Sequence, residues 1–551
     1  MKMLMPTLAP TAAALALLTL LAACSKPADP PAAPVVAVAV PAAPAAPAAP
    51  KTVAWIKAHS DAEVDAAFAS ARSEGKPVFL YWGATWCPPC NQVKATIFTR
   101  ADFIARSQGF IPVYVDGDLP GAQKLGQRFK VRGYPTMVLF RPDGSEFTRL
   151  PGEVDAAKYL QVLALGVADA SSAAMLLPRA LAEPASLQPA DWRLLAFYSW
   201  DTDQEQLLAP KAKAATLRQL AAAVPAAQAE VATRLRLQAW AAASEPGAAK
   251  VADAAAARAQ LLALLGDAGA AREQQDMLVN DGADLVAALS TAKAVERAPL
   301  QAAMDAALVR LNADTTLSQS DRMGALISRI ALVQLAGPKV PLPPALLEQV
   351  RAEVARADRE IADEVERQSV IPSAAHALSQ AGLLDESDRL LEAELKRSHS
   401  PYYAMLQLAA NARERGDKPA ALGWTERAYR ESTGPATRVQ WGAGYVAALI
   451  ELAPQDAARI EQAAASVLAE LNGQPDAFYA RTARSVERMN GKLATWAAAK
   501  PERQAGVKRL QAKLDELCRA LPEGDVQQHA TCADLGRTLA SAPKGAKVRK
   551  A

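Results

Sequence analysis

The sequence predicts an α/β domain followed by a large all-helical region, and three observations lead to that fold class. At 551 residues the chain is too long for a single hydrophobic core, so at least two domains are expected. Between residues 52 and 166, apolar runs of strand length alternate with helical patterns. From residue 167 to residue 540, alanine, leucine, glutamine, arginine and glutamate dominate, and strand-like alternation is absent.

The composition argues against several classes of protein. The formal net charge of +3 is small for this length, so no nucleic acid partner is expected. The four histidines, at positions 59, 376, 399 and 529, are too scattered for a histidine-based metal centre, and no cofactor is expected. The five cysteines fall into three groups, which indicates three separate roles for them.

The first 24 residues have the features of an export signal. A short apolar run (AAALALLTLLAA) ends with small residues directly before Cys24. The segment Leu21–Cys24 (LAAC) resembles the lipobox of bacterial lipoproteins, which implies that Cys24 is lipidated and becomes the first mature residue. In that family an aspartate after the cysteine favours retention in the inner membrane, so the resemblance implies that Ser25 favours the outer membrane. An ordinary cleaved signal peptide with an incidental cysteine is the alternative.

Residues 25–51 are predicted to be a linker, because they consist almost entirely of proline, alanine and valine. Repeated prolines fix φ and remove amide donors, so neither a helix nor a sheet can propagate. The expected extended polyproline-II segment holds the folded part of the chain away from a lipid anchor.

The predicted α/β domain, residues 52–166, begins with a helix. Ser60 and Glu63 form a capping-box pattern that opens a helix running toward Gly75. The apolar run 78–82 (VFLYW) has the length of a buried parallel strand, and a turn then leads into Cys-Pro-Pro-Cys at 87–90 and a second helix. The later elements are predicted in order: a strand at 110–115, a helix at 122–129, a strand at 137–140, a tight turn at 142–144 and a closing helix at 155–165.

The placement of Cys87 between a strand and a helix predicts a reactive thiol. The unpaired amides and the positive end of the helix stabilise a thiolate, which is the species that attacks disulfides. Cys90 lies on the same side of the helix, so the two sulfurs can close a small disulfide ring. Half of a zinc site is the alternative, but Cys518 and Cys532 are more than four hundred residues away and no histidine is near, so no metal is expected.

Three sequence elements together resemble the thioredoxin superfamily. They are the segment 76–90 (KPVFLYWGATWCPPC), the Gly-Tyr-Pro-Thr element at 133–136 and the Pro-Asp-Gly turn at 142–144. The nearest relatives are expected among exported thioredoxin-like domains, such as the C-terminal domain of transmembrane disulfide-interchange proteins. The resemblance covers less than a quarter of the chain and implies a thioredoxin fold for residues 52–166.

The resemblance also implies roles for individual residues. Cys87 corresponds to the exposed nucleophile and Cys90 to the buried resolving thiol of the redox-active disulfide. Trp86 flanks the site, and Pro135 corresponds to the cis-proline that faces the cysteines. The Tyr134 backbone is then available to pair with a substrate strand. A trans turn proline is the alternative for Pro135.

One position departs from the family pattern. Thioredoxins usually carry a buried acidic residue six positions before the first cysteine, and that position is Tyr81 here. A tyrosine, with a reference pKa of about 10, is a poor base at neutral pH. Proton transfer from Cys90 is therefore expected to be slow, or to use water or another carboxylate. The redox direction stays open, with a lean toward reduction by analogy with the nearest relatives.

Residues 167–540 are predicted to form a stack of helices. Breaks are expected at Pro184, Pro225, Pro338–Pro344, Pro372, Pro401, Pro435 and Pro454. Aligning residues 381–382 with residues 415–416 gives an offset of 34 residues, which is the tetratricopeptide period. The region is interpreted as a tetratricopeptide-like or more general α-solenoid, whose concave surface commonly binds peptides or proteins. Its tryptophans are expected in the core.

Two cysteines near the end of the chain are expected to form a structural disulfide. Cys518 and Cys532 flank a helix break at 521–524 (LPEG), so an antiparallel helix pair brings them level. In an oxidising periplasm such a bond closes a small loop and contributes about 3 kcal/mol. A second redox pair that passes electrons to Cys87 and Cys90 is the alternative. The basic residues 541–551 are expected to be disordered.

The sequence therefore predicts a membrane-tethered periplasmic thiol–disulfide oxidoreductase. Cys87 attacks a substrate disulfide, Cys90 resolves the mixed disulfide, and the helical region recruits the partner. The expected partners are envelope proteins carrying thiols or disulfides, together with a redox partner that is a membrane electron carrier or an oxidant. The alternative is a non-enzymatic envelope scaffold, whose helical repeats bind a partner and whose thioredoxin fold is only structural.

Overall fold

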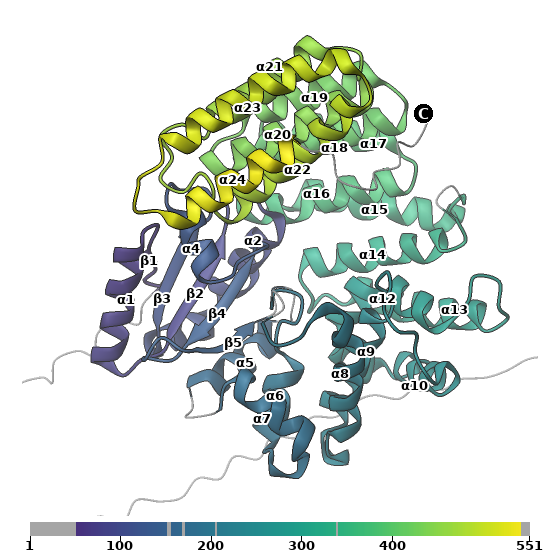
Figure 1. Ribbon diagram of the computed structural model, residues 1–551. Helices are drawn as coiled ribbons and strands as arrows, with labels where there is room; N and C mark the ends of the chain where they lie inside the picture. Colours follow the sequence, from purple (N-terminus) through teal and green to yellow (C-terminus); the bar gives the residue numbers. More distant parts are fainter. Residues whose placement is uncertain are drawn as a thin grey trace, which may run out of the picture. The chain divides into compact units, whose positions relative to one another are not determined.

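The computed structural model describes residues 51–150, 152, 156–167, 171–203, 206–337 and 340–540. The expected signal peptide with Cys24, the linker up to residue 50 and the basic tail at 541–551 lie outside the described residues. The described part begins with an α/β domain and continues as a long all-helical region (Figure 1). The predicted fold class is therefore confirmed.

The α/β domain is built on a mixed sheet of five strands within the described residues. The strands are β1 (Ile56–Lys57), β2 (Val78–Gly83), β3 (Ile111–Asp116), β4 (Thr136–Phe140) and β5 (Glu146–Leu150). Their order across the sheet is β1-β3-β2-β4-β5. The first three in that order are parallel, whereas β4 runs antiparallel to β2 and β5 runs antiparallel to β4.

Helices cover both faces of this sheet. They are α1 (Asp61–Glu74), α2 (Pro88–Val93), which continues as a π-helical turn (Lys94–Phe98), α3 (Ala101–Arg106), α4 (Ala122–Arg128) and α5 (Ala156–Val167). Because side chains alternate along a strand, Val78, Leu80 and Trp82 pack with α1 and α4. Phe79 and Tyr81 pack instead with α2, α3 and α5. All six residues of β2 are buried, which the continuous apolar run predicts.

Local signals set the ends of α1. The Ser60 hydroxyl accepts a hydrogen bond from the Glu63 amide at 3.4 Å, and the Glu63 carboxylate accepts one from the Ser60 amide at 3.0 Å. This reciprocal pair is the predicted capping box. The helix stops at Gly75, whose φ of +64° lies in the left-handed region that favours glycine.

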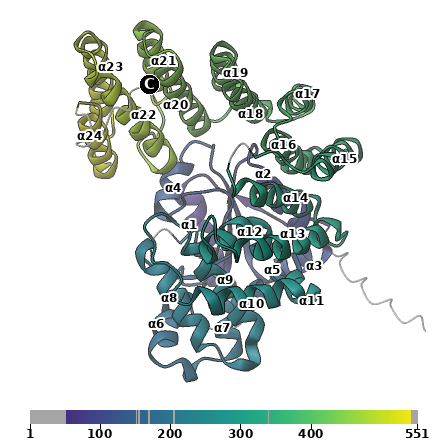
Figure 2. The same ribbon diagram turned by 90° about the vertical axis from the view of Figure 1, so that its right-hand side faces the viewer.

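The rest of the chain forms helices that pack side by side in successive pairs (Figure 2). They are α6 (Ala173–Ala182), α7 (Pro189–Ala196), α8 (Pro210–Ala223), α9 (Ala229–Ala242), α10 (Ala254–Gly266), α11 (Ala268–Glu273), α12 (Gln275–Leu289), α13 (Arg297–Ala313), α14 (Gln319–Gln334), α15 (Pro344–Glu360), α16 (Glu364–Gln380), α17 (Leu384–Glu394), α18 (Pro401–Glu414), α19 (Lys418–Glu431), α20 (Pro435–Leu452), α21 (Ala457–Ala469), α22 (Ala480–Ala498), α23 (Gln504–Arg519) and α24 (Val526–Ala540). None of the helices in the described ranges is long and apolar enough to cross a membrane.

Prolines mark several of the helix boundaries, but Pro178 and Pro372 lie inside helices. Pro344, Pro401 and Pro435 occupy the first turn of a helix, where the missing amide costs nothing. The expected break at Pro372 is wrong, because this proline lies inside α16. The lost backbone hydrogen bond there costs about 3 kcal/mol. Burial of the α16 residues around it, including Ile371, outweighs that cost.

Two helix pairs carry the predicted 34-residue offset. Leu384 begins α17 and Lys418 begins α19, so the same offset separates the second helices of the two pairs. Gly382 and Gly416 precede these helices and both have a φ of +78°, a conformation that favours glycine. The tetratricopeptide-like assignment of the whole region stays a prediction. The predicted core tryptophans are buried, apart from Trp424, which is half-buried.

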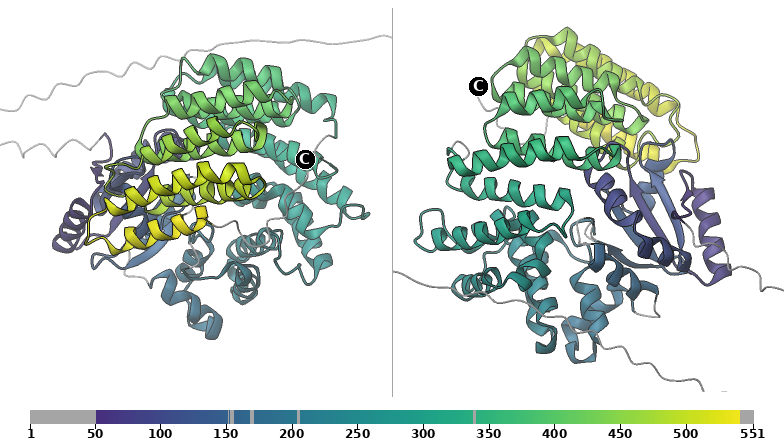
Figure 3. Two further views of the ribbon diagram at one scale, coloured as in Figure 1. Left: turned by 45° about the horizontal axis from the view of Figure 1, so that its top comes forward. Right: turned by 180° about the vertical axis from the view of Figure 1, so that it is seen from behind.

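Two helices of the α/β domain lie against distant helices of the same chain. α2 packs beside α16, and α4 packs beside α22, as the front and rear views both show (Figures 1 and 3). These contacts bring residues that are about three hundred positions apart to the end of the sheet where β2 stops. All described residues belong to one compact unit.

Candidate redox site

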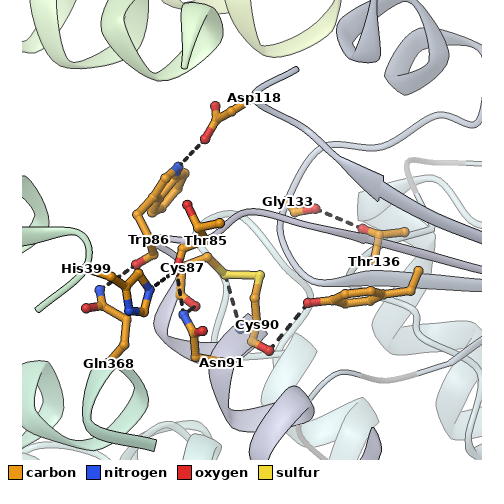
Figure 4. Close-up of a disulfide and its surroundings, with 11 residues drawn as sticks. Thr85, Trp86, Cys87, Cys90, Asn91, Asp118, Gly133, Thr136, Gln368 and His399 are labelled. Atoms are coloured by element: carbon orange, nitrogen blue, oxygen red, sulfur yellow. Dashed lines mark hydrogen bonds between the residues drawn. A yellow bond between two sulfur atoms is a disulfide. The ribbon is translucent and has the colours of Figure 1, made fainter. Parts of the chain in front are cut away.

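Cys87 and Cys90 form a disulfide at the beginning of α2 (Figure 4). Cys87 is the N-cap residue, and Pro88 and Pro89 fill the first two helical positions, so few amides are left unpaired there. The Cys90 amide donates a hydrogen bond to the Cys87 sulfur at 3.2 Å. This amide lies at the positive end of the helix, the place where a thiolate is stabilised in proteins.

The peptide bond between Tyr134 and Pro135 is cis. The register pairs Trp82 with Thr136, so the residues before β4 lie beside the loop that follows β2 and carries the cysteines. The Thr136 hydroxyl donates a hydrogen bond to the Gly133 carbonyl at 2.9 Å and closes this turn. The cis bond excludes the trans alternative for Pro135, and the prediction that this proline faces the cysteines stays a prediction.

Tyr81 fills the position of the usual buried acid, and a second tyrosine stacks on it. The rings of Tyr81 and Tyr114 lie 5.1 Å apart at an angle of 18°, and the two residues pair across β2 and β3. The Tyr81 hydroxyl points to the Cys90 carbonyl oxygen at 3.4 Å. Burial raises the pKa of the Tyr81 hydroxyl, so this group cannot take a proton from Cys90 at neutral pH.

A carboxyl group close to this pair has an unusual environment. Asp116 ends β3 opposite Gly83, and burial raises its pKa, assisted by the neighbouring charge of Asp118. Burial also lowers the pKa of the Lys94 ammonium, an effect that the charge of Asp116 partly offsets. Asp116 is therefore a carboxyl group with raised proton affinity on the cysteine side of the sheet.

The side chain of Trp86 is tied to the loop after β3 and to the helical region. Its indole nitrogen donates to the Asp118 carboxylate at 2.7 Å. The Thr437 hydroxyl donates to the same carboxylate at 2.5 Å, and the Arg481 guanidinium forms an ion pair with it. The centre of the Arg481 guanidinium also lies 4.9 Å from the centre of the Tyr134 ring. Asp118 thus joins the sheet domain to α20 and α22.

Comparisons with known proteins agree with this geometry. A model of the thioredoxin-like domain matches residues 64–166. A thioredoxin of Mycobacterium tuberculosis is 31% identical over 100 residues, which are 18% of this chain and 82% of that protein. The chain belongs to the thioredoxin family.

Larger relatives also match the thioredoxin domain. The thiol:disulfide interchange protein DsbD of Pseudomonas fluorescens is 36% identical over 112 residues, which are 20% of this chain and 19% of that protein. The protein DsbD 2 of Pseudomonas aeruginosa is 33% identical over 111 residues, 19% of either chain. The chain therefore spans about a fifth of the length of these curated relatives.

The thioredoxin domain differs from expectation in the exposure of its cysteines. Cys87 corresponds to the exposed nucleophile of the family, yet its exposed fraction is only 3%. Cys90 is fully buried, and Trp86 is 9% exposed. The physical cause is the helical region, because the Trp86 ring packs against Tyr403 and Trp441 with centroid distances of 6.0 and 5.0 Å.

Sequence reasoning missed the residues of the helical region that reach the site. Gln368 donates its amide to the Trp86 carbonyl at 2.9 Å, and a ring nitrogen of His399 lies 3.0 Å from the Thr85 carbonyl (Figure 4). Arg481 and Thr437 reach Asp118 as described above. Each of them is more than 280 positions away from its partner, and no local pattern in the sequence marks such a contact.

A cavity of about 450 Å³ opens beside the cis-proline of the thioredoxin domain. Tyr134 and Pro135 line one side, and residues of the helical region, including Trp200, Arg234 and Asp276, line the other. Arg234 and Asp276 neutralise each other through two hydrogen bonds of 3.0 and 2.6 Å. The cavity thus adjoins the residues that the resemblance assigns to substrate pairing.

The second cysteine pair lies far along the chain. Cys518 of α23 and Cys532 of α24 form a disulfide with Cα atoms 5.8 Å apart. Cys532 is fully buried in the apolar core of these helices. Within the described ranges, no group of three or more histidine, cysteine, aspartate and glutamate side chains is arranged to hold a metal ion.

Proposed function

We propose that the protein is a thiol–disulfide oxidoreductase that works through Cys87 and Cys90. The observation that carries the proposal is the Cys87–Cys90 disulfide at a helix start in a thioredoxin domain with a cis-proline. In the reduced protein, the Cys87 thiolate attacks a substrate disulfide, which forms a mixed disulfide and expels one substrate thiolate. The Cys90 thiolate then attacks the Cys87 sulfur, and the second substrate thiol leaves. The substrate has gained two electrons, and the protein is oxidised.

The proton of Cys90 needs an acceptor in this sequence of steps. Burial raises the pKa of the Tyr81 hydroxyl and excludes it as a base at neutral pH. Asp116, whose pKa burial also raises, is the carboxyl group suited to the task, directly or through water. Run in reverse, the same steps oxidise a substrate dithiol, so the direction depends on the redox partner.

We further propose that the protein acts in the bacterial periplasm on a lipid anchor at Cys24. Support comes from the lipobox-like segment, from Ser25, which favours the outer membrane, and from the proline-rich linker at 25–51. The Cys518–Cys532 disulfide fits an oxidising compartment. The partners are then envelope proteins with thiols or disulfides, together with a membrane electron carrier or an oxidant. Palmitate labelling that persists in Cys24→Ala would exclude this anchor.

Trapping of reaction intermediates tests the enzyme proposal. The Cys90→Ala variant keeps the nucleophile but lacks the resolving thiol, so mixed disulfides through Cys87 should accumulate. A Cys87→Ala, Cys90→Ala double variant is the matched control and should trap nothing. Non-reducing gels of envelope extracts, followed by mass spectrometry of the Cys87 peptide, give the readout.

A second candidate function is favoured by one specific observation. Cys87 is almost fully buried, which suits an envelope scaffold whose thioredoxin fold is only structural. In that case the Cys90→Ala variant accumulates no mixed disulfide, although the protein still binds its partners. The trapping experiment therefore separates the two functions.

A further inference from the structure

The cysteine end of the thioredoxin domain is covered by helices from a distant part of the same chain. Ala84, Trp86, Cys87 and Cys90 belong to an apolar core whose other buried members come from the segment 402–539. Four helices supply the contacts, and we refer to α16, α18, α20 and α22 as the cap helices. They meet the domain at the loop that carries the redox-active pair and at α2 and α4.

Trp86 is the centre of the covered surface. Tyr403 of α18 stacks on its ring at an angle of 18°, and Trp441 of α20 meets the ring at 63°. Gln368 of α16 donates to its backbone carbonyl at 2.9 Å. The Arg481 guanidinium of α22 lies 5.5 Å from the ring centre. All four cap helices therefore contact the residue that directly precedes Cys87.

A buried ion pair fastens this contact. Asp118 of the thioredoxin domain and Arg481 of α22 are 8% and 7% exposed, and they pair with each other. Next to them, the Asp476 carboxylate accepts a hydrogen bond from the Gln123 amide at 2.7 Å. The Gln123 side chain in turn accepts one from the Arg481 amide at 2.9 Å. Buried charges need their partners, so this arrangement favours one position of α22.

Disulfide exchange requires direct contact between the attacking sulfur and the substrate sulfur. The low exposure of Cys87 and Trp86 leaves no room for a protein substrate at the attacking sulfur. We infer that the cap helices form an autoinhibitory cap, which closes over Cys87 and must move away before a protein substrate reacts. This inference rests on the proposed function, because an inert cysteine pair needs no cap.

The packing indicates which part moves. Helices α6–α9 share one continuous apolar core with the α2 face of the sheet, so they stay with the thioredoxin domain. Only four buried residues of the domain join the core of the cap side. The bonds from Gln368 and His399 end on backbone carbonyls, which water can hydrogen-bond after opening. The apolar contact of the domain with the cap is therefore smaller than its apolar contact with α6–α9.

Alkylation of the full-length, reduced protein tests the cap. Two maleimides with the same reactive group are compared: N-ethylmaleimide, which is small, and a maleimide on a polyethylene glycol chain, which is bulky. The rate at Cys87 is read from its peptide by mass spectrometry, so the other cysteines do not interfere. The ratio of the two rates cancels any change in thiol reactivity, because both reagents attack the same thiolate.

The variants Arg481→Met and Thr437→Val remove, respectively, the ion pair and one hydrogen bond to Asp118. Arg329→Met, which removes a buried arginine that pairs with Asp305 in the helical region, is the matched control. The wild-type protein and the control should alkylate slowly with the bulky reagent. Arg481→Met should raise the bulky-to-small ratio about tenfold or more, because it removes a buried charge partner. Thr437→Val, which preserves side-chain shape, should raise it less.

Two results would overturn the cap. One is a bulky-to-small rate ratio at Cys87 of the wild-type protein that equals the ratio measured for a free cysteine peptide. The other is an unchanged ratio in both variants when circular dichroism shows that they are folded. Because a closed cap also blocks trapping, the trapping experiment is repeated with the Arg481→Met, Cys90→Ala variant, in which the cap is loosened. Alkylation needs no turnover, so a protein that shows the size dependence but whose loosened variant traps no substrate keeps the cap and loses the proposed function.

Discussion

Replacing Arg481 with methionine should destabilise the protein through the charge that it leaves behind. Asp118 is nearly buried, and the arginine is the cation that pairs with it. Removing one partner of a buried ion pair costs roughly 3–5 kcal/mol. Asp118 keeps its hydrogen bonds from Trp86 and Thr437, at 2.7 and 2.5 Å. The expected loss is therefore at the lower end, about 3 kcal/mol.

A double-mutant cycle isolates this pair. The free energy of unfolding is measured by urea denaturation for the wild type, Arg481→Met, Asp118→Asn and the double variant. Once the charge of Asp118 is gone, the loss of the arginine should cost less, with a coupling of at least about 1 kcal/mol. Additivity of the two single effects within about 0.5 kcal/mol would mean that Arg481 and Asp118 do not stabilise the fold as a pair. The unfolding must be followed by two probes, because local opening at α22 would break two-state behaviour.

Three further predictions follow from the structure. Replacing Cys518 and Cys532 with serine should lower the free energy of unfolding by about 3 kcal/mol, because the unfolded chain gains loop entropy. Asp116→Asn should stabilise the protein more at about pH 7 than at about pH 4, since the raised pKa of Asp116 means that stability falls as its carboxyl ionises. Tyr81→Phe should change the rate of disulfide exchange by less than about twofold, because its hydroxyl is not the base.

Each of these predictions has a result that would contradict it. For the serine double variant, urea denaturation that is unchanged from the wild type would show that the second disulfide is not structural. For Asp116→Asn, equal effects at the two pH values would mean that burial does not raise the pKa of this carboxyl. For Tyr81→Phe, a large decrease in the rate of disulfide exchange, at an unchanged reduction potential of Cys87–Cys90, would show that the Tyr81 hydroxyl takes part in proton transfer.

Most of the thioredoxin domain could be predicted because its signals are local. The Ser60–Glu63 capping box and the continuous apolar run of β2 are read directly from the sequence, and both appear in the structure. The cysteine pair and Pro135 could be located for the same reason, since a short motif carries them. Pro372 misled the prediction, because tertiary burial of α16 outweighs a local helix-breaking preference.

The environment of the site could not be predicted. The exposure of Cys87 depends on helices that begin almost three hundred residues later, and helical periodicity does not say which helix packs where. The pairing of Asp118 with Arg481 likewise depends on how α22 is placed against α4. Each of the two residues, seen alone in the sequence, suits a solvated surface position. Only the folded chain turns them into a buried pair.

The reduction potential of the Cys87–Cys90 pair distinguishes a disulfide that exchanges with substrates from a purely structural one. The full-length protein is equilibrated with glutathione buffers, and the oxidised fraction of each pair is read by alkylation and mass spectrometry. We expect a reversible two-electron transition with a midpoint potential above about −300 mV. The slope should be about 30 mV for each tenfold change in the equilibrium constant. The Cys518–Cys532 disulfide serves as an internal reference and should titrate below that value. If the midpoint potential of Cys87–Cys90 also lies below about −300 mV, the pair is structural and the proposed exchange chemistry is contradicted.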